Sequence, residues 1–183
     1  MSCLESVKFS SIECDVTLID NGSSEESISS LRNGLAEFSN VKLIESKDNL
    51  GFSGGVNLGL RDGRTERYQH ILLLNNDAKI EEDTVEKLIH SLENNPDLGG
   101  VNPTIYDGRT GEIWFAGGIL YKWAGVVRHN RKLPRQKSTE LENSKVLKNG
   151  YLNGCCVLFR REVFDRIGEL DEDLFMYGDD IDL

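Results

Sequence analysis

HILLLNND, residues 70–77, is a short apolar segment that ends in two amides and a carboxylate. The branched residues from Ile71 to Leu74 predict a buried strand. From about Glu82 to Leu92, leucine and valine recur at helical spacing and Pro96 follows, which predicts a helix. The segment therefore begins a strand–helix unit, with its polar residues in the connection.

The same alternation extends toward the N-terminus. A β-branched run, Asp15–Asp20, predicts a strand that ends at an Asn-Gly turn. Ser23 or Ser24 then predicts the cap of a helix that reaches about Phe38, and Val41–Glu45 predicts the next strand. Strands that alternate with helices are typical of a largely parallel α/β sheet with helices on its faces. We therefore predict an α/β fold.

Toward the C-terminus the pattern changes. Residues 101–106 and 113–115 flank a turn-rich link, which predicts a hairpin and a sheet that becomes mixed. Residues 123–147 are polar and poor in periodicity, which predicts a surface loop. Residues 154–159 predict a buried strand, and residues 161–167 predict a short helix.

Length and composition indicate one soluble domain spanning residues 1–183. Hydrophobic residues make up 38% of the 183 residues and charged residues 28%. The net charge of −10 makes nucleic acid an unfavourable partner. The four cysteines fit neither a disulfide framework nor a metal knuckle, so we expect them to be reduced and mostly buried.

The sequence contains neither a membrane-spanning segment nor a secretory signal. Apolar runs are far shorter than the roughly 20 residues that cross a bilayer, and the N-terminus does not resemble a secretory signal. We therefore expect a cytoplasmic protein, with peripheral association at the inner face of the membrane left open. Nothing in the sequence sets the oligomeric state.

Both ends of the chain are abrupt. Residues 171–183 are dense in acids and aromatics and lack a closing element, and residues 3–9 predict a helix with no strand before it. We expect the domain to be truncated at both ends.

Four polar sites lie at or just beyond predicted strand ends, at Asp20, residues 49–57, residues 75–77 and residues 179–182. Ligands of open α/β sheets bind outside the carboxyl ends of the strands. We therefore expect the four sites to face one cleft.

Asn75, Asn76 and Asp77 would place oxygen ligands at the edge of the sheet. Hard divalent cations prefer such ligands and can bridge a diphosphate, which makes Asp77 the natural metal ligand. The same three residues also favour turns and helix caps, so a purely structural role stays open.

Two further stretches have similarly ambiguous chemistry. Glycine-rich residues 51–55 before a helix would bring backbone amides near an anion, or would only supply unusual dihedral angles in a tight loop. Asp179, Asp180 and Asp182 raise one another's pKa, so one of them could act as a base; a solvated acidic segment explains them equally well.

Taken in order, these motifs resemble glycosyltransferase family 2, and within it the rhamnosyltransferase-like members. The matching stretches are VTLIDNGS (16–23), NLGFSGGVNLG (49–59), LLLNND (72–77) and GELDEDLFMYGDDIDL (168–183). The resemblance covers nearly the whole chain, and its second and fourth stretches are the specific ones.

The resemblance implies a nucleotide-diphospho-sugar transferase fold of the GT-A type, with a mostly parallel, partly mixed sheet. It also implies a metal (Mg or Mn) at Asp77 and a catalytic pair in which Asp180 is the base and Asp179 stands where glutamate is commoner. The residues that it implies for donor binding are Asp20, Asn21, Asn49, Gly51, Phe52, Gly55, Asn57, Asn75 and Asn76.

The sequence departs from the family pattern in three places. In similar enzymes an arginine-bearing helix follows the stretch that ends here at Leu183. Asn75 stands where the first acid of the metal motif is usual. The first strand, which carries a nucleotide contact in similar enzymes, has no counterpart here.

The implied activity is an inverting hexosyltransferase that moves a sugar from a nucleotide-sugar donor, of the dTDP-rhamnose or UDP-sugar type, to a glycan or lipid-linked acceptor in cell-surface polysaccharide synthesis. A sugar nucleotidyltransferase has the same kind of sheet, and a non-catalytic nucleotide-sugar-binding fragment would explain the abrupt ends. Both alternatives stay open at this point.

Overall fold

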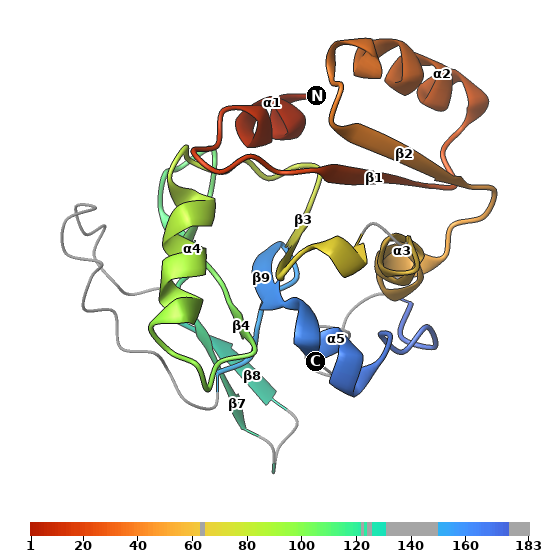
Figure 1. Cartoon of the computed structure of the whole chain (residues 1–183). Coiled ribbons are helices and arrows are strands. Elements are labelled where there is room, and N and C mark those ends of the chain that lie inside the picture. The colour runs from red at the N-terminus through yellow and green to blue at the C-terminus, as the bar shows by residue number, and fades with distance from the viewer. Residues whose placement is uncertain (63–64, 122, 124–125, 131–149, 176–183) are drawn as a thin grey trace.

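The structure is a computed structural model that describes residues 1–62, 65–121, 123, 126–130 and 150–175. Its N-terminal part is a parallel pair of strands, β1 (Val16–Asn21) and β2 (Val41–Ser46), joined by helix α2 (Glu25–Gly34) (Figure 1). Helix α3 (Gly51–Leu60) follows β2 and packs on β1. This is the βαβα pattern that the sequence predicts.

Local signals set the bounds of α2. The side chain of Ser24 accepts a hydrogen bond from the amide of Ser27, so it caps the helix as predicted. The helix ends at Gly34 and continues as the 3₁₀ turn η1 (Leu35–Glu37). The predicted end near Phe38 is therefore correct for the helical segment as a whole.

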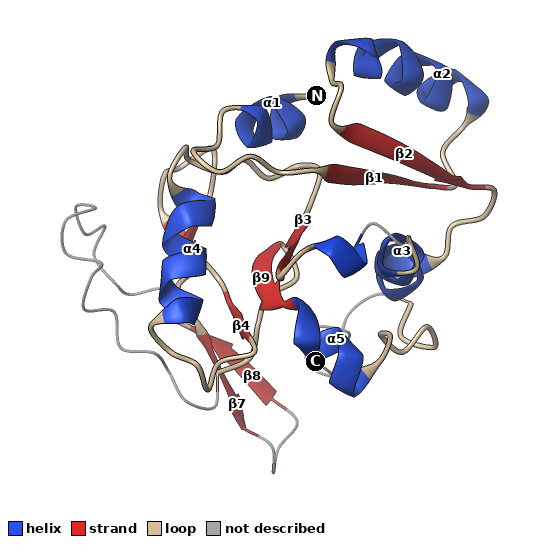
Figure 2. Ribbon diagram, in the orientation of Figure 1, coloured by secondary structure: helices blue, strands red, loops and turns tan. Residues whose placement is uncertain are grey.

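The second sheet has three antiparallel strands, with β9 (Cys156–Arg160) between β3 (His70–Leu74) and β4 (Gly100–Val101) (Figure 2). Helix α4 (Thr84–Glu93) packs on β9 and β4, and Leu88, Leu92 and Leu158 form the hydrophobic core there. β9 is buried from Cys156 to Phe159, because it is the central strand. Helix α5 (Arg161–Ile167) follows it directly.

The remaining strands form two hairpins. β5 (Ile105–Tyr106) pairs with β6 (Ile113–Phe115), as predicted, and β7 (Gly118–Tyr121) pairs with β8 (Val126–His129). The second hairpin corrects the sequence analysis, which predicted a loop from residue 123 onward. Burial alternates along β7 and β8, as expected for paired strands. The mixed composition of this stretch gave no clear strand pattern in the sequence.

Helix α1 (Ser2–Lys8) lies beside the segment that follows β3. It buries Cys3, Leu4 and Val7, and the hydroxyl of Ser6 accepts a hydrogen bond from the amide of Ile80 at 3.2 Å. A second 3₁₀ turn, η2 (Thr65–Arg67), precedes β3. All four cysteines are free thiols, and two of them, Cys3 and Cys156, are buried.

The predicted α/β fold class is confirmed, and two details of it are corrected. Only β1 and β2 pair in parallel among the described strands, because β9 comes from far along the chain and enters antiparallel between β3 and β4. The glycine-rich residues 51–55 belong to α3 itself and do not form a loop before it.

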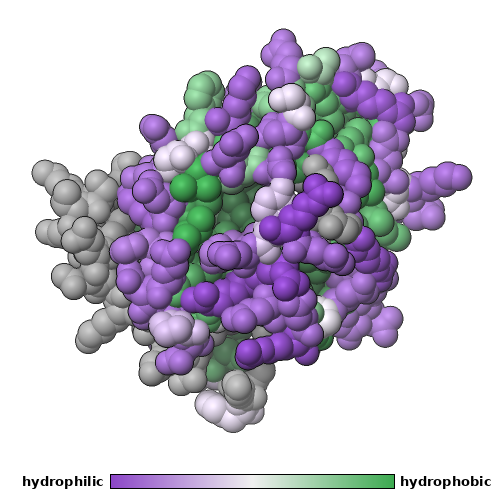
Figure 3. All heavy atoms as spheres, in the orientation of Figure 1, coloured by the Kyte–Doolittle hydropathy of each residue, from purple (hydrophilic) through white to green (hydrophobic). Residues whose placement is uncertain are grey.

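The surface agrees with the composition. Hydrophilic side chains cover most of the face shown in Figure 3, as the net charge of −10 leads one to expect. In the part of the chain that the structure describes, no helix combines the length and the apolar character needed to cross a bilayer.

Candidate functional site

Asn21 joins the carboxyl ends of β1 and β2 to the start of α3. Its Nδ2 donates to the carbonyl oxygen of Gly51 at 2.8 Å and to Oδ1 of Asn49 at 3.3 Å, and its Oδ1 accepts from the amide of Leu50 at 2.9 Å. Oδ1 of Asn49 also accepts from the amide of Gly51 at 3.0 Å. The structure thus brings together Asn21, Asn49 and Gly51, three of the residues predicted to bind the donor.

Asp20 and Gly55 complete this group. Asp20 is buried, with 7% of its surface exposed, and its Oδ2 accepts from the amide of Ser23 at 3.2 Å. Gly55 faces Asn21 so closely that a Cβ there would lie 3.4 Å from Nδ2 of Asn21. One carboxylate oxygen of Asp20 therefore holds the turn after β1, as the sequence allowed, and a contact with a nucleotide would use the other.

The first amides of α3 bond within the chain. The amides of Leu50 and Gly51 donate to Asn21 and Asn49, and the amide of Phe52 donates to the carbonyl of Phe175 at 3.0 Å. Gly51 has a φ of 72°, and a Cβ there would overlap the Phe175 carbonyl, so only glycine fits. These three amides are therefore not available to an anion, contrary to one interpretation of the glycine-rich motif.

Asn57, in the middle of α3, is fully buried. Its Nδ2 donates to the carbonyl of Leu170 and to Oε1 of Glu172, both at 2.9 Å, and its Oδ1 accepts from the amide of Leu170 at 2.8 Å. Both polar atoms of the side chain are thus bonded to residues 170–172. A direct contact with a donor would require these bonds to break.

Asn75, Asn76 and Asp77 follow β3 at the edge of the three-stranded sheet. The amide of Asn75 donates to the carbonyl of Cys155 at 2.9 Å, and the carbonyl of Asn75 accepts from the amide of Ala78 at 3.1 Å, which closes a turn. The side chains of Asn76 and Asp77 are exposed. The backbone of Asn75 is thus bonded within the chain, and the carboxylate of Asp77 lies at the surface.

Two cysteines, Cys3 and Cys155, lie close enough to Asp77 for its carboxylate to affect their thiols. Burial raises the pKa of the Cys155 thiol, and the carboxylate of Asp77 raises it further. Burial raises the pKa of Cys156 to about 12. Burial therefore favours the neutral form of both thiols, and Asp77 offers a carboxylate oxygen at this strand end.

Phe52 connects the two strand ends. Its ring packs on Gly154, where a Cβ would lie 2.9 Å from Cζ of Phe52, and Gly154 immediately precedes Cys155, which bonds to Asn75. The residues after β1, the start of α3 and the residues after β3 therefore lie in one contiguous region. The expectation that all four polar sites face one cleft stays a prediction.

The fourth site, with Asp179 and Asp180, lies outside the described residues. The residues that lead to it are described, because Leu174 and Phe175 bond to the start of α3. The predicted catalytic pair therefore follows directly on a segment that contacts this region.

A divalent cation suits the side chains at the end of β3. Among the described residues no cluster of three histidine, cysteine, aspartate or glutamate side chains could hold a metal ion. Magnesium-type sites commonly use one or two carboxylates and complete their shell with substrate phosphates and water. The single exposed carboxylate of Asp77, which follows Asn75 and Asn76, fits that kind of site and does not fit a site made by protein ligands alone.

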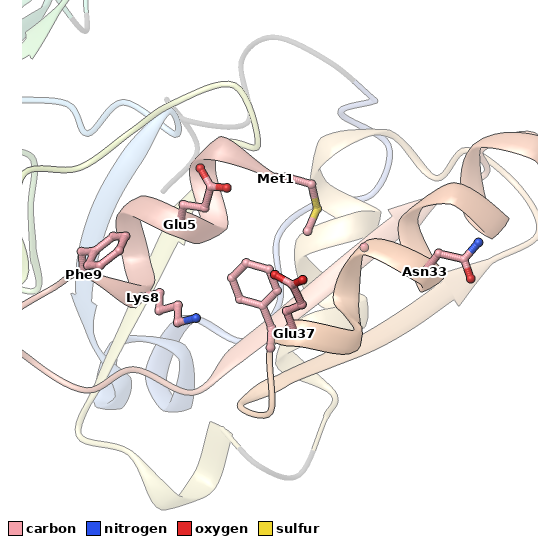
Figure 4. Close-up of a pocket in the computed structure, with 8 residues that line it drawn as sticks. Met1, Glu5, Lys8, Phe9, Asn33 and Glu37 are labelled. Carbon is pink, nitrogen blue, oxygen red and sulfur yellow. The ribbon is translucent and has the colours of Figure 1, made fainter.

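One hollow of about 430 Å³ lies elsewhere, between α1 and the end of α2 (Figure 4). Met1, Glu5, Lys8 and Phe9 line it from α1 and its C-cap, and Phe38 is among the residues that line it from the other side. Because α2 runs back from the carboxyl end of β1, this hollow lies at the amino ends of β1 and β2. It is thus at the opposite edge from the predicted site.

Sequence analysis missed several residues that build the region. Ser53, Arg61, Glu169 and Glu172 all bond between α3 and residues 169–174. Their only signal in the sequence is spacing, because Ser53, Asn57 and Arg61 recur every four residues and so share one face of a helix.

The sequence profile of glycosyl transferase family 2 matches residues 2–168. A curated relative, the low-salt glycan biosynthesis hexosyltransferase Agl10 of Haloferax volcanii, is 27% identical over 171 residues, which are 92% of this chain and 51% of that protein. The chain therefore spans about half the length of this relative.

Two solved structures resemble the fold. One is the mannosyltransferase PcManGT from Pyrobaculum calidifontis in complex with GDP-Man and Mn²⁺, with a TM-score of 0.59 at 15% identity over 93% of this chain and 43% of that one. The other is GalNAc-T7 with UDP, GalNAc and Mn²⁺, with a TM-score of 0.64 at 14% identity over 96% of this chain and 35% of that one.

Proposed function

The chain belongs to glycosyl transferase family 2, and from this premise we propose that it transfers a hexose from a nucleotide-sugar donor to a glycan or lipid-linked acceptor. The family and the GT-A type fold predicted from the motifs are confirmed. The rhamnosyltransferase-like subgroup, and with it a donor of the dTDP-rhamnose or UDP-sugar type, belongs to the proposal. One observation carries it: Asn21 at the end of β1 bonds to the start of α3, and Phe52 of α3 packs on Gly154, whose neighbour Cys155 bonds to Asn75 after β3.

In the proposed reaction the donor nucleotide lies against the carboxyl end of β1. Asp20 is placed to accept a hydrogen bond from it, and the bonds of Asn21 to Leu50 and Gly51 hold the wall of the site. Asp77 would hold a divalent cation, which neutralises the charge of the departing nucleoside diphosphate. The GDP-Man, UDP and Mn²⁺ of the two similar structures support such a donor and such a metal.

Asp180 is the proposed general base. It takes the proton from an acceptor hydroxyl as the oxygen attacks the anomeric carbon, and the bond to the nucleotide breaks on the opposite side. A single displacement of this kind inverts the anomeric configuration. Asp179 is the neighbouring carboxylate that keeps the proton affinity of the pair high.

The products test this reaction. Incubation with a panel of nucleotide sugars, Mn²⁺ and a glycan acceptor should release free nucleoside diphosphate, and the new linkage should have inverted configuration by NMR. Release of pyrophosphate would favour a sugar nucleotidyltransferase instead. A complete lack of donor binding in calorimetry would favour a non-catalytic fragment.

The proposal includes an approach to the cytoplasmic membrane surface through the β7–β8 hairpin. Ile119, Tyr121, Val126 and Arg128 share the exposed face of this hairpin, and Trp123 at its tip is 89% exposed. Tryptophan and tyrosine favour the bilayer interface, and arginine is attracted to anionic lipid. Arg128 also begins the short basic stretch of the sequence, RHNRKLPRQK (128–137), in a chain that is otherwise acidic.

Replacing Trp123 by serine should weaken binding to vesicles that contain phosphatidylglycerol by about tenfold or more, because burying a large aromatic ring contributes roughly 1.5–3 kcal/mol. Co-sedimentation measures this, with phosphatidylcholine vesicles as the uncharged reference. Phe9→Ser removes an aromatic ring that is 71% exposed on α1's C-cap and should leave binding unchanged. Equal binding of Trp123→Ser and the unaltered protein would contradict membrane contact through this hairpin.

A further inference from the structure

One face of α3 is bonded along its length to residues 169–175. At its first turn the amide of Phe52 donates to the carbonyl of Phe175 at 3.0 Å, and the hydroxyl of Ser53 donates to the carbonyl of Leu174 at 3.2 Å. One turn later Asn57 bonds to Leu170 and Glu172. Residues 169–175 form neither a helix nor a strand, so their backbone groups are satisfied by a short turn around Asp171 and by the bonds to α3.

Asn57 is the centre of this contact. Its amide bonds to both the N–H and the C=O of the same residue, Leu170, which fixes the backbone there as a neighbouring strand would. Both Asn57 and Leu170 are buried, so no water replaces these bonds if one is lost. A buried polar group without a partner is strongly unfavourable, which makes the contact specific for an amide side chain.

Arg61 closes the outer edge of the contact. Its guanidinium donates to both carboxylate oxygens of Glu169, at 2.7 and 2.5 Å, and to Oε1 of Glu172 at 2.8 Å. The guanidinium holds the pKa of Glu169 below its usual range, so the pair remains charged at neutral pH. Glu172 therefore receives hydrogen bonds from both Asn57 and Arg61.

The chain enters this segment through a glycine. Helix α5 ends at Ile167, and Gly168 follows with a φ of 80° and no atom near the position of a Cβ. Within the described residues, every hydrogen bond that joins residues 169–175 to another part of the chain goes to α3 or to its C-cap, Arg61. The path of the chain after Gly168 thus depends on α3.

We propose that Asn57 is a positioning residue, which fixes residues 170–175 on α3 and thereby anchors the part of the chain that precedes the predicted catalytic pair, Asp179 and Asp180. This inference rests on the proposed function, because it assigns Asp180 as the base. It gives Asn57 a role different from the direct donor contact that the family resemblance implies. The same helix contacts Asn21 through Gly51, so one element bonds both to the residue at the end of β1 and to the segment that precedes the proposed base in the sequence.

The test is Asn57→Asp, which keeps the size of the side chain and its acceptor oxygen. It removes both N–H donors and sets a carboxylate against Glu172. We expect kcat to fall about 10- to 100-fold, since a displacement of about 1 Å at a reacting group has effects of that order. The KM and the calorimetric Kd for the donor should change less than about twofold, because no donor contact is lost.

A second substitution separates positioning from general damage. In the double variant Asn57→Asp with Glu172→Gln, the new amide can donate to the new carboxylate, which restores the bond with its direction reversed. The double variant should regain only part of the lost kcat, because the bond to the carbonyl of Leu170 stays broken. Asn33→Asp makes the same chemical change at an exposed position of α2 and should leave kcat unaltered.

Circular dichroism establishes whether each variant is folded. If Asn57→Asp does not fold, Ser53→Ala serves instead, because it removes only the bond to Leu174 and should lower kcat by a smaller factor at constant donor KM. A folded Asn57→Asp with unaltered kcat would overturn the inference, and so would a loss of donor affinity in step with kcat. Failure of the proposed function gives a different result, namely full turnover by Asp180→Asn.

Discussion

Replacing Asp180 by asparagine is expected to lower kcat for sugar transfer by about 10²- to 10⁴-fold, which is the usual contribution of a general base. The amide cannot accept the proton of the acceptor hydroxyl, yet it keeps the size and polarity of the carboxylate. The donor Kd should therefore stay within about twofold of the unaltered value. Steady-state kinetics with saturating donor, together with calorimetry for the donor alone, measures both quantities.

Asp182→Asn is the matched control, because Asp182 lies two residues further along the same acidic stretch. It should retain most of the activity. If Asp180→Asn turned over at the unaltered rate, the assignment of the base would be wrong, whatever the other variants did. A large loss for both variants alike would indicate that net charge matters in this stretch and not one carboxylate.

The second large effect is expected from Asp77→Asn. Loss of the only carboxylate in the motif after β3 should weaken the metal and lower kcat/KM by about 10²-fold or more, because a cation on a leaving diphosphate stabilises the transition state by several kcal/mol. Part of the activity should return at high Mn²⁺ concentration. Titration of activity against Mn²⁺ after treatment with EDTA measures this.

The control for Asp77→Asn is Asp97→Asn, which removes an exposed carboxylate after α4, away from the end of β3. It should show the metal titration of the unaltered protein. Full activity of the unaltered protein in EDTA would contradict a role for a divalent cation. If the activity of Asp77→Asn depended on Mn²⁺ as that of the unaltered protein does, the cation would have to be bound by other residues.

Local sequence signals predicted most of the elements. The cap at Ser24, the strand before Asn75 and the helix that ends near Leu92 all follow from neighbours within a few residues. The position of β9 could not be predicted in this way, because its partners in β3 lie about 90 residues earlier in the chain. The helical start of α3 was also missed, since glycine weakens a helix unless close contacts, such as that of Gly51 with Phe175, require it.

In the candidate site, too, contacts between neighbouring strand ends were predictable and contacts between distant residues were not. The rule that ligands bind at the carboxyl ends of strands placed Asp20, Asn21 and Asn49 together correctly. The bonds of Asn57 and Arg61 to residues 169–172 could not be derived, because more than 100 residues separate the partners. Donor contacts, the metal at Asp77, the catalytic pair and the single-domain boundaries stay predictions.

The central place of β9 has a consequence for how the protein is made. β3 and β4 do not pair with each other, and each bonds to β9, which leaves the ribosome only after about 90 further residues have followed the start of β3. Synthesis proceeds at about 5–20 residues per second, so roughly 5–20 s separate the synthesis of β3 from that of its partner β9. During that interval the nascent chain exposes an aggregation-prone strand, so its yield in cells should depend on chaperones that bind apolar segments.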